Sequence, residues 1–221
     1  MGVINRVIGA RNRAPNIDTI VGFRPMSDLI SAPEPGKIRV HISGISPETF
    51  LSEFNLQKVE LHEAAVALFF ISATKGALSE QIEEWVLARE LYVPSIVLIT
   101  DLAKSEVDFD DMAAIISKQL DPVVTPLLVL HDDLGLPAAL IDLDSLKIHT
   151  YEKGELKVHE SDPEHKVLVF EFRKEYLEAL EAAGDDAFNQ GLLFPALPFS
   201  YADGMGRFEL AGYLNSLPGS S

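Results

Sequence analysis

The chain has 221 residues, and 47% of them are hydrophobic, which provides enough apolar material for one large folded domain or two small ones. A formal net charge of −16 argues against direct contact with nucleic acid or anionic membranes, because both need clustered Lys and Arg. The absence of cysteine excludes disulfides and cysteine metal sites. No apolar run reaches the ~20 residues of a membrane helix, and no signal-peptide core is present, so we expect a cytoplasmic location.

The first part of the chain predicts two strands and a helix. Val3–Ile8 is a short apolar-rich run, and a basic turn over Ala10–Pro15 follows it. Lys37–Ile42 alternates apolar and polar residues, as a half-buried strand does. Ser46-Pro47-Glu48 supplies an N-cap, a Pro at the first helical position and an acidic first turn. We therefore expect a helix from this point toward Leu61.

Strands and helices alternate from residue 65 onward. Apolar runs and amphipathic segments predict the order strand 65–71, helix 79–90, strand 94–99, helix 107–120 and strand 123–130. Continuous apolar runs are typical of strands buried on both faces, and their alternation with helices favours a parallel sheet. We expect an α/β fold, a three-layer sandwich with a mostly parallel sheet and helices on both faces.

The last third of the chain departs from this alternation. Two short strands within 137–151 flank Asp144-Ser145, which predicts an added β-hairpin. The other segments are expected to be an exposed connection at 151–164, a strand at 166–172, a helix at 175–183, a last strand at 192–199 and a closing helix at 205–217. For 192–199 a buried strand is favoured, and an exposed dimer or docking surface is the alternative.

The loop after the first strand differs from a phosphate-binding loop. In the pattern G-x-x-x-x-G-K-[ST], backbone amides cradle phosphate, the Lys neutralises charge and the hydroxyl holds magnesium. Gly9 is in register, but Ala14-Pro15-Asn16 stands where the pattern has Gly, Lys and a hydroxyl residue. Arg11 and Arg13 are the cations that remain, and an ordinary basic surface turn is the preferred interpretation.

The ends of the later strands also lack nucleotide ligands. A magnesium-linked Asp is expected after the strand at 37–42, but Ile42 stands there. Thr100-Asp101-Leu102-Ala103 replaces the Asn-Lys-x-Asp sequence that selects guanine, and Asp101 is expected to face solvent. After the last strand, only Ser200 remains of an expected Ser-Ala turn.

Other groups of reactive side chains form weak patterns. His131-Asp132-Asp133 and residues 159–165 contain metal-ligand types without the regular spacing of a metal site. We expect solvated acidic loops at both places and predict no metal site. No G-x-S-x-G sequence indicates a nucleophile-elbow hydrolase. Trp85 is expected to cover the core from its helix.

From about Lys37 to Pro218, the chain resembles the G domain of bacterial elongation factor G and its close relatives. KIRVHISGI is similar to the strand that leads to the family's Asp-Thr-Pro-Gly turn, and Gln81, Trp85 and Val93-Pro94 stand where the family has them. The segment HDDLGLPAALIDLDSLKIHTYEKG, with Asp142-Leu143, resembles a hairpin peculiar to this branch of translational GTPases. The resemblance implies a P-loop NTPase-like fold.

The resemblance also implies that the chain is a single degenerate G domain over residues 1–221. The regions that stand apart are a poorly matched start at 1–36, a hairpin with an acidic insertion at 137–172 and a tail at 218–221. The first switch is too short, since few residues separate Asn16 from Lys37. Only Gly9 and Ser200 keep family motif positions, so the family's binding residues do not transfer as a set.

Three hypotheses follow. The first is a pseudo-GTPase that has lost GTP binding and hydrolysis, so it is not an enzyme and needs no cofactor. Its partner would be an unidentified protein, and a ribosome-associated protein is one option. The second is a translation protein that binds GTP or GDP with Mg²⁺ through substituted positions, namely Gly9, Arg11, Arg13, Thr100, Asp101 and Ser200. The third is an enzyme that binds a small molecule or a metal in the strand-end crevice. The oligomeric state stays open.

Overall fold

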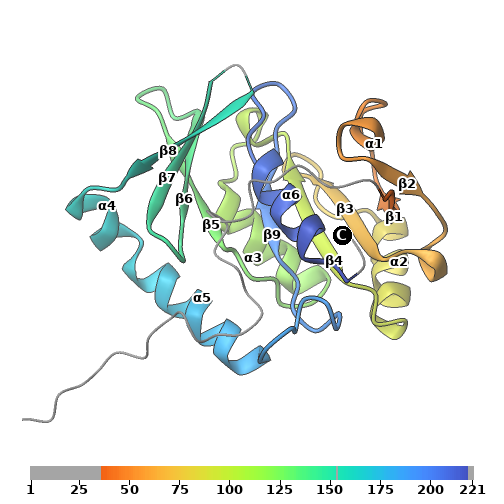
Figure 1. Cartoon of the computed structure of the whole chain (residues 1–221). Coiled ribbons are helices and arrows are strands. Elements are labelled where there is room, and N and C mark those ends of the chain that lie inside the picture. Colours follow the sequence, from red (N-terminus) through yellow and green to blue (C-terminus); the bar gives the residue numbers. More distant parts are fainter. Residues whose placement is uncertain (1–35, 153, 219–221) are drawn as a thin grey trace, which may run out of the picture.

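The computed structural model describes residues 36–152 and 154–218, and five of its strands form one parallel sheet (Figure 1). The strand order is β2-β1-β3-β4-β9, and every neighbouring pair is parallel. The bounds are Ile38–Ser43 for β1, Leu56–Lys58 for β2, Val66–Ser72 for β3, Ser95–Thr100 for β4 and Ala196–Pro198 for β9. The expected α/β class with a mostly parallel sheet is confirmed. The strand predicted at Val3–Ile8 and the turn after it lie outside the described residues.

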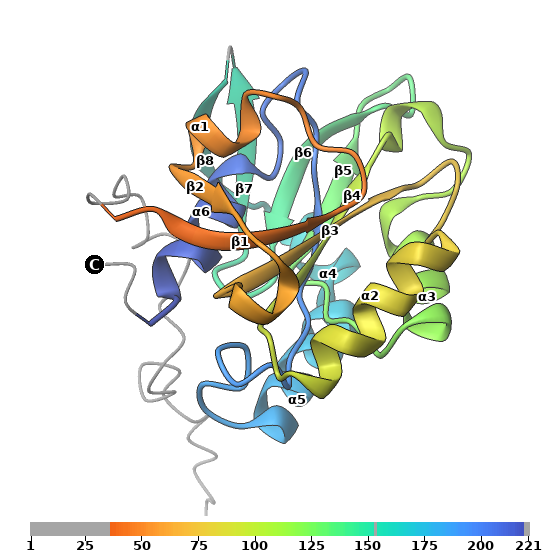
Figure 2. The ribbon, with the colours of Figure 1, turned by 90° about the vertical axis from the view of Figure 1, so that its right-hand side faces the viewer.

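Helices cover both faces of this sheet (Figure 2). Ser79–Glu90 (α2) and Phe109–Gln119 (α3) pack on one face, and Phe50–Glu53 (α1) and Arg207–Ser216 (α6) pack on the other. The helices predicted at 79–90, 107–120 and 205–217 are therefore confirmed within a few residues at each end.

The central strand β3 explains why both faces need cover. All six residues of Val66–Ile71 are buried, and alternate side chains point to opposite faces because the strand period is two. Phe70 joins the cluster beneath α1 and α6, whereas Phe69 joins the cluster beneath α2 and α3. Trp85 of α2 is 1% exposed and packs edge-on against Phe69 at 5.0 Å, so its predicted place over the core is confirmed.

A second sheet is antiparallel and has the order β5-β6-β7-β8. Its strands are β5 Leu127–His131, β6 Pro137–Asp142, β7 Lys147–Glu152 and β8 Glu155–Glu160. The hairpin predicted around Asp144-Ser145 is the β6–β7 connection and is confirmed. The strand predicted at 123–130 divides between the two sheets, because Val124 forms a parallel bridge with Pro195 beside β9, whereas β5 pairs antiparallel with β6. Only a five-residue loop joins those two strands, and a parallel crossover needs a dozen residues or more.

The long helix predicted from Ser46 to Leu61 was also wrong. The helix α1 has four residues and no side-chain cap, and Asn55 then takes a left-handed φ of 51°. Leu56–Lys58 is an edge strand that pairs with β1. Burying Leu56 in the sheet while bonding the free edge of β1 outweighs the local helix signal, as tertiary contacts often do.

Two predictions after the hairpin need correction. The expected connection at 151–164 contains β8, which completes the antiparallel sheet, and the expected strand at 166–172 is helical. Pro163–Leu168 forms α4, and Phe170–Ala183 forms α5. Asp162 starts α4 by accepting a hydrogen bond from the backbone N of His165 at 2.9 Å, a cap signal that the charged sequence obscured. The helix predicted at 175–183 is confirmed as part of α5.

The segment predicted as the last strand is buried along most of its length. Only Ala196–Pro198 has strand geometry, but Phe194 and Phe199 are also buried, at 4% and 2% exposure. The alternative of a docking surface at 192–199 therefore fails, because Leu192 is the one large apolar side chain there that remains exposed.

A buried polar cluster joins the second sheet to α6. Glu209 is 2% exposed, and its Oε1 accepts a hydrogen bond from the Tyr151 hydroxyl at 2.5 Å and lies 2.7 Å from Nδ1 of His149. Burial, followed by the nearby Glu209 charge, raises the pKa of Tyr151 far above its usual value, so the phenol keeps the proton that it donates. The cluster fixes the position of β7 against the helix.

The backbone at the start of α6 requires glycine. Gly206 has a φ of 81°, and a Cβ at this position would lie 2.0 Å from the carbonyl oxygen of Pro198. We expect Gly206→Ala to lower the free energy of unfolding by about 3 kcal/mol, measured by urea denaturation. Gly135→Ala is the matched control, since Gly135 has a φ of 76° with open space around it and should cost about 1 kcal/mol. Equal losses in the two variants would contradict the steric argument.

The cluster around Glu209 yields a second stability prediction. Tyr151→Phe removes the hydroxyl donor and leaves a buried carboxylate less satisfied, so the free energy of unfolding should fall by about 2 kcal/mol at neutral pH. Tyr92→Phe serves as the control, because Tyr92 is 65% exposed and its change should stay within about 0.5 kcal/mol. A Tyr151→Phe variant as stable as the control would show that the hydrogen bond contributes nothing.

Candidate functional site

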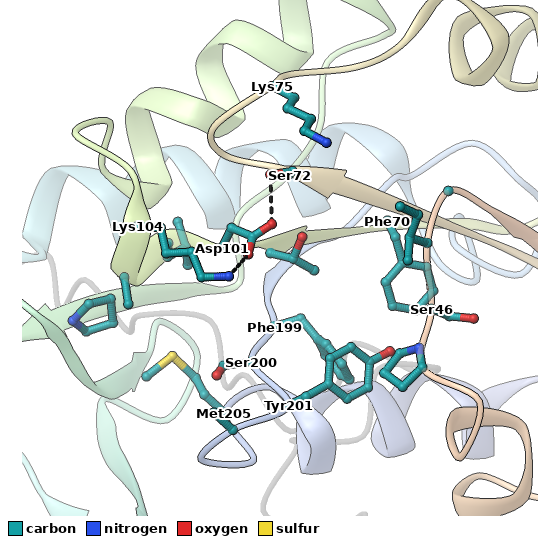
Figure 3. Close-up of a pocket in the computed structure, with 18 of the residues that line it drawn as sticks. Ser46, Phe70, Ser72, Lys75, Asp101, Lys104, Phe199, Ser200, Tyr201 and Met205 are labelled. Atoms are coloured by element: carbon teal, nitrogen blue, oxygen red, sulfur yellow. Dashed lines mark hydrogen bonds and ion pairs between the residues drawn. The ribbon is translucent and has the colours of Figure 1, made fainter.

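A pocket of about 530 Å³ opens at the carboxyl ends of the parallel strands (Figure 3). The residues that follow β1, β3, β4 and β9 all contribute to its lining. Carboxyl ends of parallel strands meet at one edge of a sheet, and in open α/β sheets this edge is where ligands bind. The volume lies within the range of small-molecule sites.

Aromatic rings form one side of the pocket. Phe70, Phe199 and Tyr201 line it, and Figure 3 shows Phe199, Ser200 and Tyr201 near Met205, with Ser72, Asp101 and Lys104 on the other side. The rings of Phe70 and Tyr201 are nearly parallel with centroids 6.4 Å apart, and Phe199 meets Tyr201 edge-on at 4.9 Å. Phe70 and Phe199 are only 4% and 2% exposed, so these contacts hold the two rings in the core beneath the pocket, and Tyr201 is the partly exposed ring of the three.

Asp101 is a pocket side chain with two polar partners. Its backbone has a left-handed φ of 60°, which turns the chain sharply after β4. The carboxylate accepts a hydrogen bond from the Ser72 hydroxyl and another from the Lys104 ammonium, both at 2.8 Å. These bonds, the one from Lys104 first, hold the pKa of Asp101 below its usual value. Asp101 faces solvent in part, as expected, since its side chain is 35% exposed, but its carboxylate is also bonded to two partners.

Gln81 fixes the turn that closes the pocket beside β1. This side chain is 3% exposed, its Nε2 donates to the Phe70 carbonyl at 2.9 Å, and its Oε1 accepts from the Leu78 amide at 3.1 Å. Gly44 approaches so closely that a Cβ there would lie 2.8 Å from the Gln81 amide nitrogen. Gln81 therefore has a structural role, and its bonds tie the start of α2 to β3.

The structure brings together three of the six predicted site residues. Thr100, Asp101 and Ser200 line this pocket, and Gly9, Arg11 and Arg13 lie outside the described residues. The sequence interpretation missed the aromatic wall and Lys75. Lys75, Phe199 and Tyr201 follow strand ends, where chemistry-bearing residues gather, and Phe70 lies within β3, but none of these side chains matches a nucleotide motif.

Two histidines of the segments that contain metal-ligand residue types each lie close to one carboxylate. His131 lies 3.6 Å from Asp108, and His165 lies 2.9 Å from Asp162. Within residues 36–152 and 154–218, no three His, Asp or Glu side chains are arranged to hold a metal ion. The strand residue His41 has a local partner, Glu84, at 3.6 Å.

Every internal position of the described sheet is filled by direct strand pairing. Val40 is opposite Val66 and Ser43 is opposite Phe69, so β1 and β3 are hydrogen-bonded neighbours along their shared length. The pairs β3–β4 and β4–β9 are equally direct. A further parallel strand would have to join this sheet at an outer edge.

The comparisons with known proteins find a solved structure with a similar fold but no matching family. No protein-family model and no curated protein matches the chain. Among solved structures, the chain is similar to the protein ttk003000868 from Thermus thermophilus, with 28% sequence identity and a TM-score of 0.62. The match covers 72% of this chain and 27% of that one, so this chain spans about a quarter of the structure that it matches. In the described part of the chain, none of the helices combines the length and the apolar character that crossing a membrane requires.

Ser72→Ala tests the electrostatics of the pocket. Loss of the hydroxyl donor should raise the pKa of Asp101 toward its usual 3.8, which an NMR titration of the Asp101 carboxyl carbon measures directly. Because the folded-state pKa is lowered, the stabilisation from Asp101 is complete above pH 3.8 and is lost as the pH falls through the folded value. The variant should therefore lose less stability on acidification. Ser79→Ala, at an exposed serine outside the pocket, is the control, and an unchanged Asp101 pKa in Ser72→Ala would contradict the assignment.

Proposed function

We propose that the chain is a relative of the elongation factor G-type GTPase domains, with a P-loop NTPase-like fold, that has lost GTP binding and hydrolysis. It acts as a protein-interaction scaffold in the cytoplasm, and its partner is a protein rather than nucleic acid or a membrane. The order of strands and helices, the added hairpin, and similarity to a quarter of a longer chain all support this proposal.

The composition of the strand-end pocket is the observation that carries the proposal. Thr100, Asp101 and Ser200 lie together where the resemblance expects a guanine site, but Asp101 is already bonded to Ser72 and Lys104. A nucleotide needs several cations or a metal ion to balance its phosphates, because phosphoryl groups depend on such compensation. Lys75 is the one pocket cation in the described residues that lacks a carboxylate partner.

The direct pairing of β1 with β3 adds a second line of support. A phosphate-binding loop works at the carboxyl end of its own strand, beside the other strand ends. The described sheet leaves that strand no internal position. The described sheet therefore offers no central strand from which such a loop could reach the pocket.

The alternative function, a GTP-binding translation protein with substituted motifs, rests on one observation. Thr100 and Asp101 at the end of β4 and Ser200 after β9 line a single pocket of nucleotide size. Under this alternative, GTP or GDP with Mg²⁺ is the cofactor, and Arg11 and Arg13 supply the missing charge.

Calorimetric titration with GDP and with GTP, each with magnesium, distinguishes the two functions. We expect neither heat nor thermal stabilisation, because too little positive charge faces the phosphates. Binding tighter than about 10 μM, roughly −7 kcal/mol, would favour the alternative. GTP hydrolysis by the unmodified chain that disappears in a Gly9→Val variant would contradict the scaffold proposal. Lys118→Gln, an exposed lysine on α3 outside the pocket, is the control for charge effects.

A further inference from the structure

We propose that the chain forms a twofold dimer in which β8 pairs antiparallel with β8 of a second copy, and that the same interface covers the exposed apolar side chains of α4 and the start of α5. We call residues 155–174, which carry these elements, the edge segment. None of these residues lines the strand-end pocket, so the inference goes beyond the proposed function and does not depend on it.

The outer edge of β8 is open. Within residues 36–152 and 154–218, β8 pairs with β7 alone and ends the strand order β5-β6-β7-β8 (Figure 1). The backbone N–H and C=O groups of β8 that point away from β7 therefore have no strand partner in this part of the chain. A row of such groups pairs readily with another strand, so the edge selects a strand as its occupant.

The features that usually protect a free edge are weak in β8. The strand has six residues, contains no Pro and pairs with β7 without a bulge. Its one lysine, Lys157, forms an ion pair with Glu152 of β7, so this charge is compensated within the chain. Both faces of the strand are also uncovered, because Leu156 is the one residue of β8 that is not exposed.

An apolar patch follows the end of β8. Val167, Leu168, Phe170 and Phe172 are 76%, 73%, 60% and 39% exposed. Val169 lies between them, is 4% exposed and belongs to the core beneath α5, so it anchors the two helices while its neighbours stay at the surface. Four of the fifteen large apolar side chains that the described residues expose thus fall within six consecutive positions. Clustered apolar exposure of this kind marks a protein interface.

The charges of the edge segment permit the approach of an identical copy. Residues 155–174 contain four Lys or Arg and five Asp or Glu, which gives a net charge of −1. A second group of exposed apolar side chains, Val86, Leu87 and Leu91, lies at the end of α2, where four Glu and one Arg give a net charge of −3. Two copies of α2 would repel each other far more strongly than two edge segments would.

A second copy also supplies the strand that the free edge needs. A twofold axis perpendicular to the sheet pairs two identical edges antiparallel, and the contact is closed because two chains satisfy each other. Only two residues separate β8 from α4, so pairing of the strands brings both apolar patches to the interface. The two four-stranded sheets would then form one antiparallel sheet of eight strands.

Sedimentation equilibrium of the full chain tests the proposal. We expect a reversible monomer–dimer equilibrium, with the dimer dominant at about 0.1 mM. Leu168→Glu and Phe170→Glu place a charge in the patch, so each should raise the dissociation constant of the dimer at least about tenfold. Leu134→Glu is the matched control and should leave this constant unchanged, because Leu134 is 83% exposed in the β5–β6 loop, outside the edge segment. All three side chains are exposed, so no variant should impair folding.

Amide hydrogen exchange tests the strand pairing itself. In the dimer, the β8 amides that point away from β7 should exchange about tenfold more slowly than in the monomeric Phe170→Glu variant, because the second copy bonds them. The amides of β2, the edge strand of the parallel sheet, are the control and should exchange equally in both proteins.

Three outcomes would overturn the inference. The first is a chain that stays monomeric at about 0.5 mM. The second is a dimer that Leu134→Glu weakens as much as Leu168→Glu does. The third is a dimer whose outward β8 amides exchange as fast as those of the monomer, since another surface would then join the copies. Magnesium-dependent GDP binding would contradict the proposed function alone, whereas a monomer would contradict this inference alone.

Discussion

The direct hydrogen bonding of β1 to β3 is the constraint on which the rest of the structure depends. It places two strand ends side by side, with Ser43 opposite Phe69, and so brings the turn at Gly44 against Phe70. Because β3 is then paired on both edges and buried on both faces, helices must cover the sheet on each side. The pocket forms where these paired strands end together.

The same constraint shapes the chemistry of the pocket. At the ends of β3 and β4, Ser72 and Asp101 come close enough to bond, and Lys104 completes the group. Side chains that satisfy each other in this way stabilise the turn but are less available to a ligand. Among the pocket cations of the described residues, Lys75 is exposed and has no carboxylate within ion-pair distance, so its ammonium stays available.

Local patterns in the sequence predicted the central units of the fold well. The apolar run at 65–71 and the helix at 79–90 were found because burial on two faces, or on one helical face, leaves a clear periodicity. The failures occurred where long-range pairing competes with local signals. The edge strand β2 follows an apparent helix start, and β8 is a charged strand with no buried face to mark it. For the candidate site, motif positions identified Thr100, Asp101 and Ser200, whereas Lys75 and the aromatic wall match no motif.

The sequence by itself determined the α/β class, the added hairpin and the departures of the motif positions from a nucleotide site, because these depend on residue type and short-range spacing. Only the tertiary structure decided that β5 belongs to the antiparallel sheet, that Asp101 is bonded to Ser72, and that Lys75 and Tyr201 line one pocket. The physical reason is that these features join residues far apart in the chain. Their energies come from packing and hydrogen bonds that no local window of sequence contains.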